Sequence, residues 1–390
     1  MAYLDHAATT SVLPEVIEAM THELATVGNP SSLHTSGRHA RMVVEIAREQ
    51  IADALRCLPN EVIFTAGGTE ADNLAIKGMF WARHNADSRR VRILASSIEH
   101  HAVLDPVQWL GDTEQAVVEW IPVDSLGRIG IDSLNASIEK DPESVALISV
   151  MWANNEIGTV QPIEEVVAIA KAHGIPVHTD AVQAIGNLPV SFHDSGVDAM
   201  TISGHKIGGP MGIGALLLKR EYKPVPVLHG GGQEREVRSG TLPTHLIAAL
   251  GVAVASAVKH QAEHAQHVSL LRDHLIAGIK NEIPDAILNG DHVNRLPGNA
   301  HFSFPGCEGD ALLMLFDAAG VECSTGSACT AGIPQPSHVL LAMGVSKETA
   351  VGSLRFSLGR TSTQADVDAV VASVSAVVAR ARRAGKTVKV

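Results

Sequence analysis

A lysine near the middle of the chain stands where covalent chemistry with a carbonyl compound is feasible. Lys206 lies in MTISGHKIGGP, after an apolar run and beside Ser203, His205 and several glycines. A lysine amine forms a Schiff base once its surroundings lower its pKa. A surface lysine without a chemical role is the alternative, although Ser-Gly-His-Lys at the end of a strand is not a typical surface pattern.

Three further segments place polar side chains directly after apolar runs. Asp180 ends IPVHTD, where a carboxylate is unfavourable unless a cation, such as a cofactor's ring nitrogen, pairs with it; a helix N-cap is the alternative. Gly68 and Thr69, in FTAGGTEADNLAIKG, mark either a phosphate-binding helix start or an ordinary turn. His100, in SSIEHHAVLD, is suited to stacking on a planar ring or to moving protons. No carboxylate–histidine spacing there indicates a metal site.

The chain has only four cysteines, and two of them lie in VECSTGSACTAGIPQP. Cys329 follows small residues and precedes Gly332 and two prolines, which predicts a loop, whereas Cys323 follows a short strand and is expected to be buried. A disulfide between them, which does not suit a reducing compartment, and a cysteine-only metal site that also uses Cys307 are the alternatives. Cys57, at a helix end, is expected to be structural.

The elements that must position these residues alternate between strands and helices. Apolar runs at 61–66, 92–97, 117–123, 145–152, 175–180, 199–204 and 214–219 predict seven strands. The pattern indicates an α/β fold with a mostly parallel seven-stranded sheet flanked by helices. Ligands in such sheets bind at the carboxyl ends of the strands.

The pattern changes after Thr241, where a long helical stretch over about 244–283 precedes short strands and helices. We therefore expect a large domain over residues 15–255 and a smaller α+β domain made of residues 1–14 and 256–390. Thr363 and Asp366 have the spacing of a capping box and predict the start of the last helix.

The composition excludes several classes of protein. The 390 residues carry a net charge of −12 and no long basic run, which argues against a nucleic-acid partner. No apolar stretch approaches the roughly 20 residues that span a bilayer, and we expect no membrane association. The first residues lack the features of a signal peptide, so we expect a cytoplasmic protein.

The polar segments together supply what pyridoxal 5′-phosphate requires: a phosphate turn, an acid for the pyridinium, a Schiff-base lysine and a stacking imidazole. The sequence also resembles the cysteine desulfurases of the IscS/NifS type, which are fold-type I pyridoxal-phosphate enzymes. The resemblance covers essentially the whole chain. It rests on YLDHAATT, GNPSS, TAGGTEADNLAIKG, EHHAVLD, NNEIGTVQPI, HTDAVQAIG, SGHKIGGPMGIGAL, RSGTLP, STGSACTAG and RFSLGR.

The resemblance implies how the cofactor is held. Lys206 matches the Schiff-base lysine, His100 the stacking imidazole, Asp180 the partner of the ring nitrogen and Gln183 a donor to the phenolic oxygen. Further cofactor contacts are implied for Gly68, Thr69, Asn155, Ser203 and His205. Thr241 matches a phosphate ligand that the other subunit donates, which implies a homodimer.

The resemblance also implies the reaction. Asn155 and Arg355 would hold the carboxylate of L-cysteine, with Asn29 as a helper, while Lys206 or His100 moves the α-proton. Cys329 would take the substrate sulfur as a persulfide and leave L-alanine. The chain departs from the family at Gly208 and Met211, where a tyrosine and a lysine are common, and at His101, where another residue is frequent. The resemblance therefore does not define the details of the site entrance.

The sulfur acceptor is expected to be a protein, most often an iron–sulfur scaffold. The alternatives are a selenocysteine lyase, an aminotransferase of the same fold, and a sulfur-transfer or iron–sulfur scaffold without turnover. The cysteine in STGSACTAG argues against the aminotransferase. The intact set of Lys206, Asp180, His100 and Cys329 argues against the inactive scaffold.

Overall fold

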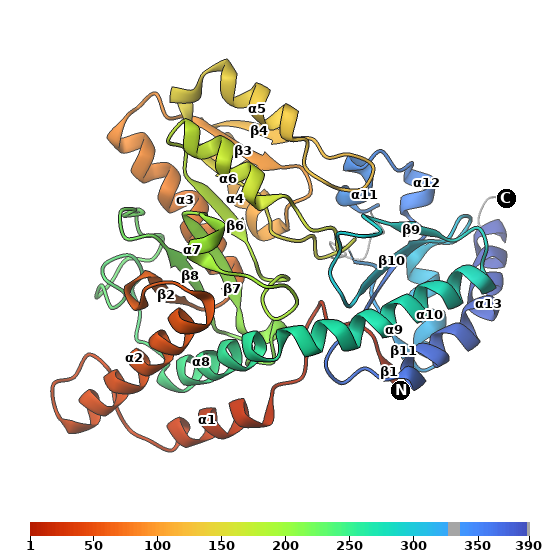
Figure 1. Ribbon diagram of the computed structural model, residues 1–390, viewed down its shortest axis with the longest axis horizontal. Coiled ribbons are helices and arrows are strands. Elements are labelled where there is room, and N and C mark those ends of the chain that lie inside the picture. Colours follow the sequence, from red (N-terminus) through yellow and green to blue (C-terminus); the bar gives the residue numbers. More distant parts are fainter. Residues whose placement is uncertain (327–335, 388–390) are drawn as a thin grey trace.

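The computed structural model describes residues 1–326 and 336–387, with side chains up to residue 384. The largest element in this part of the chain is a seven-stranded sheet with the order β2-β8-β7-β6-β5-β3-β4 (Figure 1). All neighbours are parallel except β8, which runs antiparallel to β2 and β7. The strands span Val62–Thr65 (β2), Arg92–Ser96 (β3), Val117–Ile121 (β4), Val145–Ser149 (β5), Val177–Asp180 (β6), Ala199–Ser203 (β7) and Gly214–Leu218 (β8). Each predicted apolar run contains one of them, so the predicted sheet is confirmed.

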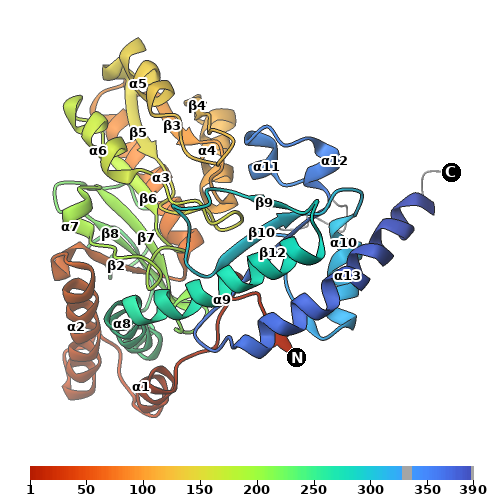
Figure 2. The same cartoon turned by 45° about the vertical axis from the view of Figure 1, so that its right-hand side comes forward.

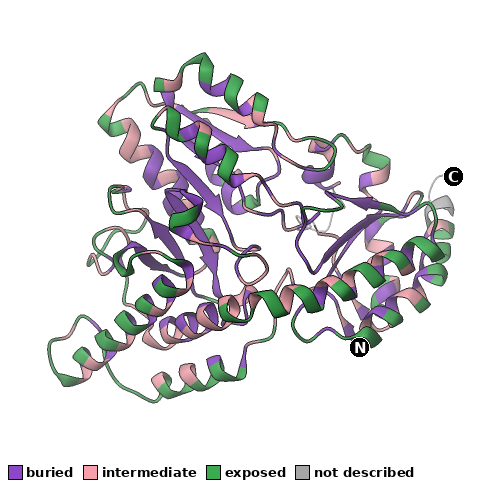
Figure 3. Cartoon of the chain, in the orientation of Figure 1, coloured by how far each residue is buried: buried purple, intermediate pink, exposed green. Residues whose placement is uncertain are grey.

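Burial explains why these strands appear as continuous apolar runs rather than alternating ones. Every residue of β2, β3, β5, β6, β7 and β8 is buried, and only the edge strand β4 is partly exposed (Figure 3). A mostly parallel sheet is covered by helices on both faces, so both sides of each strand need apolar residues.

Helices cover the two faces of the sheet and form the first core with it. On one face, α3 (Gly68–Ala86) and α4 (His101–Thr113) contribute buried side chains. The other face is covered by α2 (Thr35–Leu55), α5 (Ile131–Lys140), α6 (Ile163–Ala172), α7 (Phe192–Ser195) and α8 (Thr244–Lys259), with α1 (Pro14–Leu24) against α8. Short 3₁₀ turns lie at Pro59–Glu61 (η1), Pro142–Ser144 (η2) and Gly204–Lys206 (η3).

A second core combines the two ends of the chain (Figure 2). Its sheets are the antiparallel set β12-β10-β9 and the parallel pair β1-β11. Its elements are β1 (Ala2–Tyr3), α9 (Gln261–Glu282), β9 (Ile287–Asn289), β10 (Asn299–Ser303), α10 (Gly309–Ala318), β11 (Val321–Glu322), β12 (Ser353–Ser357) and α13 (Gln364–Thr387). The exact domain boundaries stay a prediction. The division into two domains is supported by two separate cores, one of which contains both ends of the chain.

The connection between the two cores differs from the single long helix expected over 244–283. The helical stretch is divided at His260 into α8 and α9. The reason lies in packing, because α8 contributes to the first core and α9 to the second. His260 belongs to neither helix and has a φ of −100° and a ψ of 9°.

Smaller features complete the described fold. The short helices α11 (His338–Ala342) and α12 (Lys347–Ala350) form an apolar cluster with Ile98 and Met151 from the strand ends of the large sheet. The predicted capping box precedes α13, because the Thr363 amide donates to Asp366 Oδ2 over 2.7 Å. None of the helices described is both long and apolar enough to span a bilayer.

Candidate active site

Residues from both cores line one cavity of about 330 Å³ at the carboxyl ends of the sheet strands. The first core contributes segments that follow β2, β3, β5, β6 and β7, and the second contributes β12 and residues near β11. The predicted site residues that line this cavity are Gly68, Thr69, His100, Asn155, Asp180, Gln183, Ser203, His205, Lys206 and Arg355. The structure therefore brings together residues that lie far apart in the sequence.

Lys206 ends the 3₁₀ turn that follows β7, so its side chain enters the cavity from the middle of the sheet. Its Nζ donates to the carbonyl oxygens of Ala7 and Ala8, each over 2.7 Å. Burial, together with the charge of Arg355, lowers the pKa of Lys206 to about 8. A substantial fraction of the amine is therefore neutral, and nucleophilic, near physiological pH.

Asp180 is the last residue of β6 and is buried at the cavity wall. Its Oδ1 accepts a hydrogen bond from the Val182 amide over 2.8 Å. Burial, and the neighbouring Asp72 carboxyl, raise the pKa of Asp180 to about 7. A cation placed against this carboxyl would be strongly stabilised, because it would compensate a carboxylate that burial disfavours.

The predicted stacking residue His100 is the N-cap of α4. Its Nδ1 accepts from the Ala102 amide over 3.1 Å, which fixes the ring and assigns any proton to Nε2. The surrounding protein, together with the charge of Lys206, lowers the pKa of His100 below its usual value. The imidazole is thus neutral and open to the cavity, beside Lys206.

The start of α3 has the features of an anion site. Gly67, the N-cap, has φ +152° and ψ −178°, a conformation that residues with a side chain rarely adopt. Thr69, Ser203 and His205 line this end of the cavity and also line an adjoining open cavity of about 600 Å³. Burial and the charge of Lys206 lower the pKa of His205 to about 4, so its ring is neutral.

The second core contributes Arg355, which is buried on β12. Its Nη1 donates to the Asn155 carbonyl oxygen over 2.9 Å and its Nη2 to Asp5 Oδ1 over 2.8 Å. Its Nε has no hydrogen-bond partner among the residues described. An arginine with an unused donor at the edge of a cavity can bind a carboxylate.

Two predicted site residues do not line this cavity in the single chain. Asn29 is exposed between α1 and α2, where its side chain accepts from the Ser31 amide. Thr241 is exposed in the segment before α8. Cys329 lies outside the described residues. Cys323 is buried, as predicted, and burial raises the pKa of its thiol to about 12.

Sequence reasoning found Asp180 but missed three other acidic residues at or beside the site. Asp5 pairs with Arg355, and Asp72 and Glu99 are buried beside Asp180, where burial raises the pKa of both carboxyls. Asp5 and Asp72 lie inside the motifs YLDHAATT and TAGGTEADNLAIKG, so their position in these motifs was the signal that could have identified them. In the part of the chain described, no three His, Cys, Asp or Glu side chains are grouped for a metal ion.

Comparison with known proteins agrees with this arrangement. The model of the Aminotransferase class-V family matches residues 2–370. An IscS-like cysteine desulfurase of Mycobacterium tuberculosis is 57% identical over 98% of both chains. Cysteine desulfurase IscS of Methanosarcina thermophila is 45% identical over 97% of this chain and 92% of the relative.

Solved structures extend the likeness to three dimensions. A NifS-like protein superposes with a TM-score of 0.89 at 35% identity, covering 97% of this chain and all of the other. The NifS-like protein from Rickettsia africae gives a TM-score of 0.87 at 33% identity, over 97% and 99% of the two chains. Because the family model matches residues 2–370, nearly the whole chain, this protein belongs to the aminotransferase class-V family.

Proposed function

We propose that this protein is a pyridoxal-phosphate-dependent cysteine desulfurase that converts L-cysteine to L-alanine and carries the released sulfur on Cys329. The proposal rests on one observation: Lys206, Asp180 and Arg355 line the same cavity, which both cores form. Relatives named cysteine desulfurase that match nearly the whole chain support the choice of substrate.

The residues present fit pyridoxal phosphate. Asp180, whose carboxyl is buried with a raised pKa, suits a cationic ring nitrogen, and the start of α3 suits a phosphate. Bound there, the cofactor supplies an electron sink for the bonds at the substrate's α-carbon. Lys206 would hold it covalently and Gln183 would donate to its phenolic oxygen. The residues proposed to complete the contacts are Gly68, Thr69, His100, Asn155, Ser203 and His205.

The chain's own residues then perform three tasks. Arg355 and Asn155, which both line the cavity, orient the substrate carboxylate. Lys206 moves the α-proton, because its amine is held by two carbonyl oxygens and has a lowered pKa. His100, neutral and held through Nδ1, is placed beside Lys206 to assist at Nε2.

Cys329 is proposed to take the sulfur. The carbon–sulfur bond of the substrate breaks, a sulfur–sulfur bond forms on Cys329, and the carbon skeleton leaves as alanine with the thiol's hydrogen. The other three cysteines are poor candidates, because burial raises the pKa of each thiol. A raised pKa removes the thiolate that this attack requires.

The proposal extends to assembly and partners. Following the family resemblance, we assign Thr241 to the phosphate of the partner's site in a homodimer; its exposure away from the cavity of its own chain leaves it free for that contact. Asn29 is kept as a proposed helper in substrate binding. The persulfide would pass to a protein acceptor for iron–sulfur assembly, in the cytoplasm.

Alanine and sulfide release from L-cysteine by the purified protein tests this function. The proposal predicts equal amounts of the two products in the presence of a thiol reductant. Thr241→Ala should weaken cofactor binding in the dimer although Thr241 does not line the cavity of its own chain. Turnover of selenocysteine alone, with none of cysteine, would instead assign a selenocysteine lyase.

A further inference from the structure

A separate cavity of about 610 Å³ adjoins the candidate active site where the two cores meet. Its walls come from residues 6–15, the segment 183–187, the junction of α8 and α9, and the segment that follows β12. Ala7, Gln183 and Lys206 line both this cavity and the active site. None of the tasks proposed above uses the remainder of its walls.

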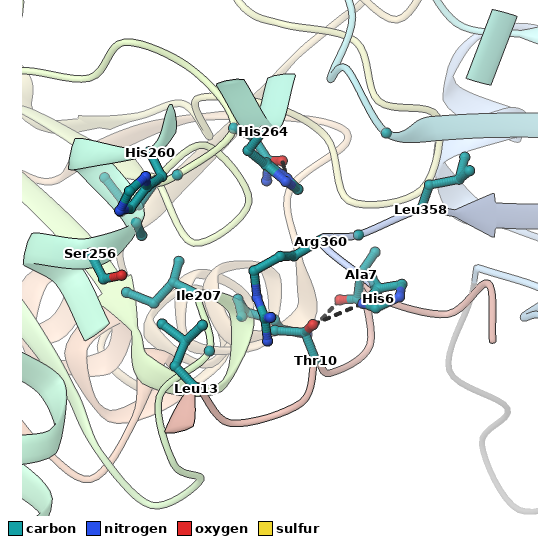
Figure 4. A pocket seen from close by; sticks show the side chains of 18 of the residues that line it. His6, Ala7, Thr10, Leu13, Ile207, Ser256, His260, His264, Leu358 and Arg360 are labelled. Carbon is teal, nitrogen blue, oxygen red and sulfur yellow. Dashed lines mark hydrogen bonds between the residues drawn. The ribbon is translucent and has the colours of Figure 1, made fainter. Parts of the chain in front are cut away.

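Basic side chains gather in this cavity, which we name the junction cavity. Besides Lys206, they comprise His6 from the N-terminal segment, three histidines on or next to α9, and Arg360 after β12. The three histidines are His260, His264 and His267, which recur on one face of the helix. Figure 4 shows the Arg360 side chain extending into the cavity below His264.

His6 is a buried basic group with an unused nitrogen. Its Nδ1 is paired with Thr10 Oγ1 at 2.8 Å, and its Nε2 has no hydrogen-bond partner among the residues described. The ring lies so close to Gly359 that a side chain there would collide with it. Burial, followed by the charges of His264 and Arg360, lowers the pKa of His6 to about 4.

Two acids, Glu15 and Glu263, line the same cavity; hydrogen bonds, followed by the charges of Arg360 and His260, lower the pKa of Glu15. Glu15 accepts a hydrogen bond from Ser256 Oγ over 3.0 Å. Glu263 is highly exposed and lies 3.7 Å from His260, at the outer end of the group. Burial, followed by the neighbouring His267 and Arg360, lowers the pKa of His264. With lowered pKa values, the rings of His6 and His264 are neutral hydrogen-bonding groups, and an anion would pair with the permanently charged Arg360.

Apolar side chains form part of the remaining walls, beside polar groups such as Thr10, Asn187 and Ser256. Leu13, Ile207 and Leu358 face the cavity around Arg360 (Figure 4). Few charged groups among apolar walls are typical of a site for a small organic molecule. A metal ion is a poor fit, because no three metal-ligating side chains are grouped among the residues described.

We infer that the junction cavity binds an organic anion whose carboxylate or phosphate lies against Arg360, His6 and His264 and whose apolar body covers Leu13, Ile207 and Leu358. This occupant would touch Ala7, whose carbonyl oxygen accepts the hydrogen bond from Lys206 Nζ. The inference goes beyond the proposed function, since it requires only the cavity and its side chains.

A fluorescent aromatic sulfonate, anilinonaphthalene sulfonate, is a suitable probe because it is an anion with an apolar body. Titration of the full-length holoenzyme should show binding that Arg360→Gln weakens about tenfold, the usual consequence of losing a charged partner. Lys223→Gln is the matched control on an exposed residue outside the cavity. Arg355→Lys should leave probe binding unchanged, because Arg355 lines only the active site.

Competition with ligands that share one tail identifies the acidic group. Octanoate displacing the probe would indicate a carboxylate, and octyl phosphate displacing it more strongly would indicate a phosphate. Equal probe binding by the wild type and Arg360→Gln would overturn the inference. Displacement by octanol as effective as by either acid would also overturn it, because it would show a purely apolar surface.

Discussion

Asp5 and Arg355, which stand 350 positions apart in the sequence, form an ion pair of 2.8 Å at the wall of the candidate active site. Asp5 follows the first strand of the chain and Arg355 lies on β12, so the pair ties the N-terminal segment to the C-terminal sheet. The same segment carries Ala7 and Ala8, whose carbonyl oxygens hold Lys206. Three residues of one short segment therefore hold both the proposed partner of the substrate carboxylate and the proposed cofactor lysine.

Arg355→Gln should raise the KM for L-cysteine at least tenfold, with a smaller effect on kcat. The reason is the loss of a charged partner for the substrate carboxylate, which is worth about 1.5–3 kcal/mol. Steady-state kinetics against L-cysteine measure the effect. Arg360→Gln is the control, because Arg360 follows β12 but does not line the active-site cavity, and it should leave the KM unchanged. An unchanged KM in Arg355→Gln would exclude Arg355 as the partner of the substrate carboxylate.

The lowered pKa of Lys206 predicts how cofactor loading depends on pH. A protonated amine cannot attack an aldehyde, so the rate of loading into cofactor-free protein should rise with pH and level off above about 8. A lysine with the ordinary value of 10.5 would give a rate that still rises beyond pH 9. Stopped-flow absorbance of the Schiff base over this pH range distinguishes the two.

Asp72 predicts a pH dependence of stability. Burial raises its pKa from 3.8 to about 7, so the folded protein binds a proton between these values that the unfolded chain does not. The resulting stabilisation is present below about pH 4 and is lost as the pH rises through 7. In cofactor-free protein, Asp72→Asn should therefore show a Tm that falls less from pH 5 to pH 8 than the wild type.

The control for this experiment is Asp112→Asn, because Asp112 is exposed on α4. Its Tm should follow the wild-type pH dependence. If the Tm of Asp72→Asn fell with pH as steeply as that of the wild type, the Asp72 carboxyl would not change its protonation on folding. Asp180 has a similarly raised pKa, so the slope in Asp72→Asn is expected to shrink rather than vanish.

Gly67→Ala should weaken cofactor binding and stability together. The φ of +152° at Gly67 is a conformation that costs a residue with a side chain about 1–3 kcal/mol. Relief of that strain would move the start of α3, where the phosphate is proposed to bind. Gly174→Ala is the control, because Gly174 also has a positive φ but lies far from the cavities. It should lower Tm and leave cofactor affinity intact.

The sequence predicted those parts of the fold that depend on local patterns. The apolar runs located all seven strands of the large sheet, and Thr363 with Asp366 located the start of α13. The break at His260 was missed, because α8 and α9 are both helical and separate only through packing on different cores. The two-residue strand β1 was missed because it pairs with β11, from the far end of the chain. The short strand expected before Cys323 is β11.

In the candidate site too, local patterns predicted some residues, whereas residues that depend on distant contacts were missed. Lys206, Asp180 and His100 were predicted because each follows an apolar strand, and the structure brings them to one cavity. Asp5 was not singled out, because its importance depends on contact with Arg355, far away in the sequence. The junction cavity was not foreseen either, since its basic residues come from three separate segments.

The most direct test of the proposed function is mass spectrometry of the protein after incubation with L-cysteine, for the wild type and Cys329→Ala, beside a measurement of released alanine and sulfide. We predict one added sulfur atom on the peptide that contains Cys329, and a variant that keeps its Schiff-base absorbance but releases neither product. Sulfide release at the wild-type rate by Cys329→Ala, or an added sulfur on Cys323 instead, would contradict the assignment of Cys329 as the sulfur carrier.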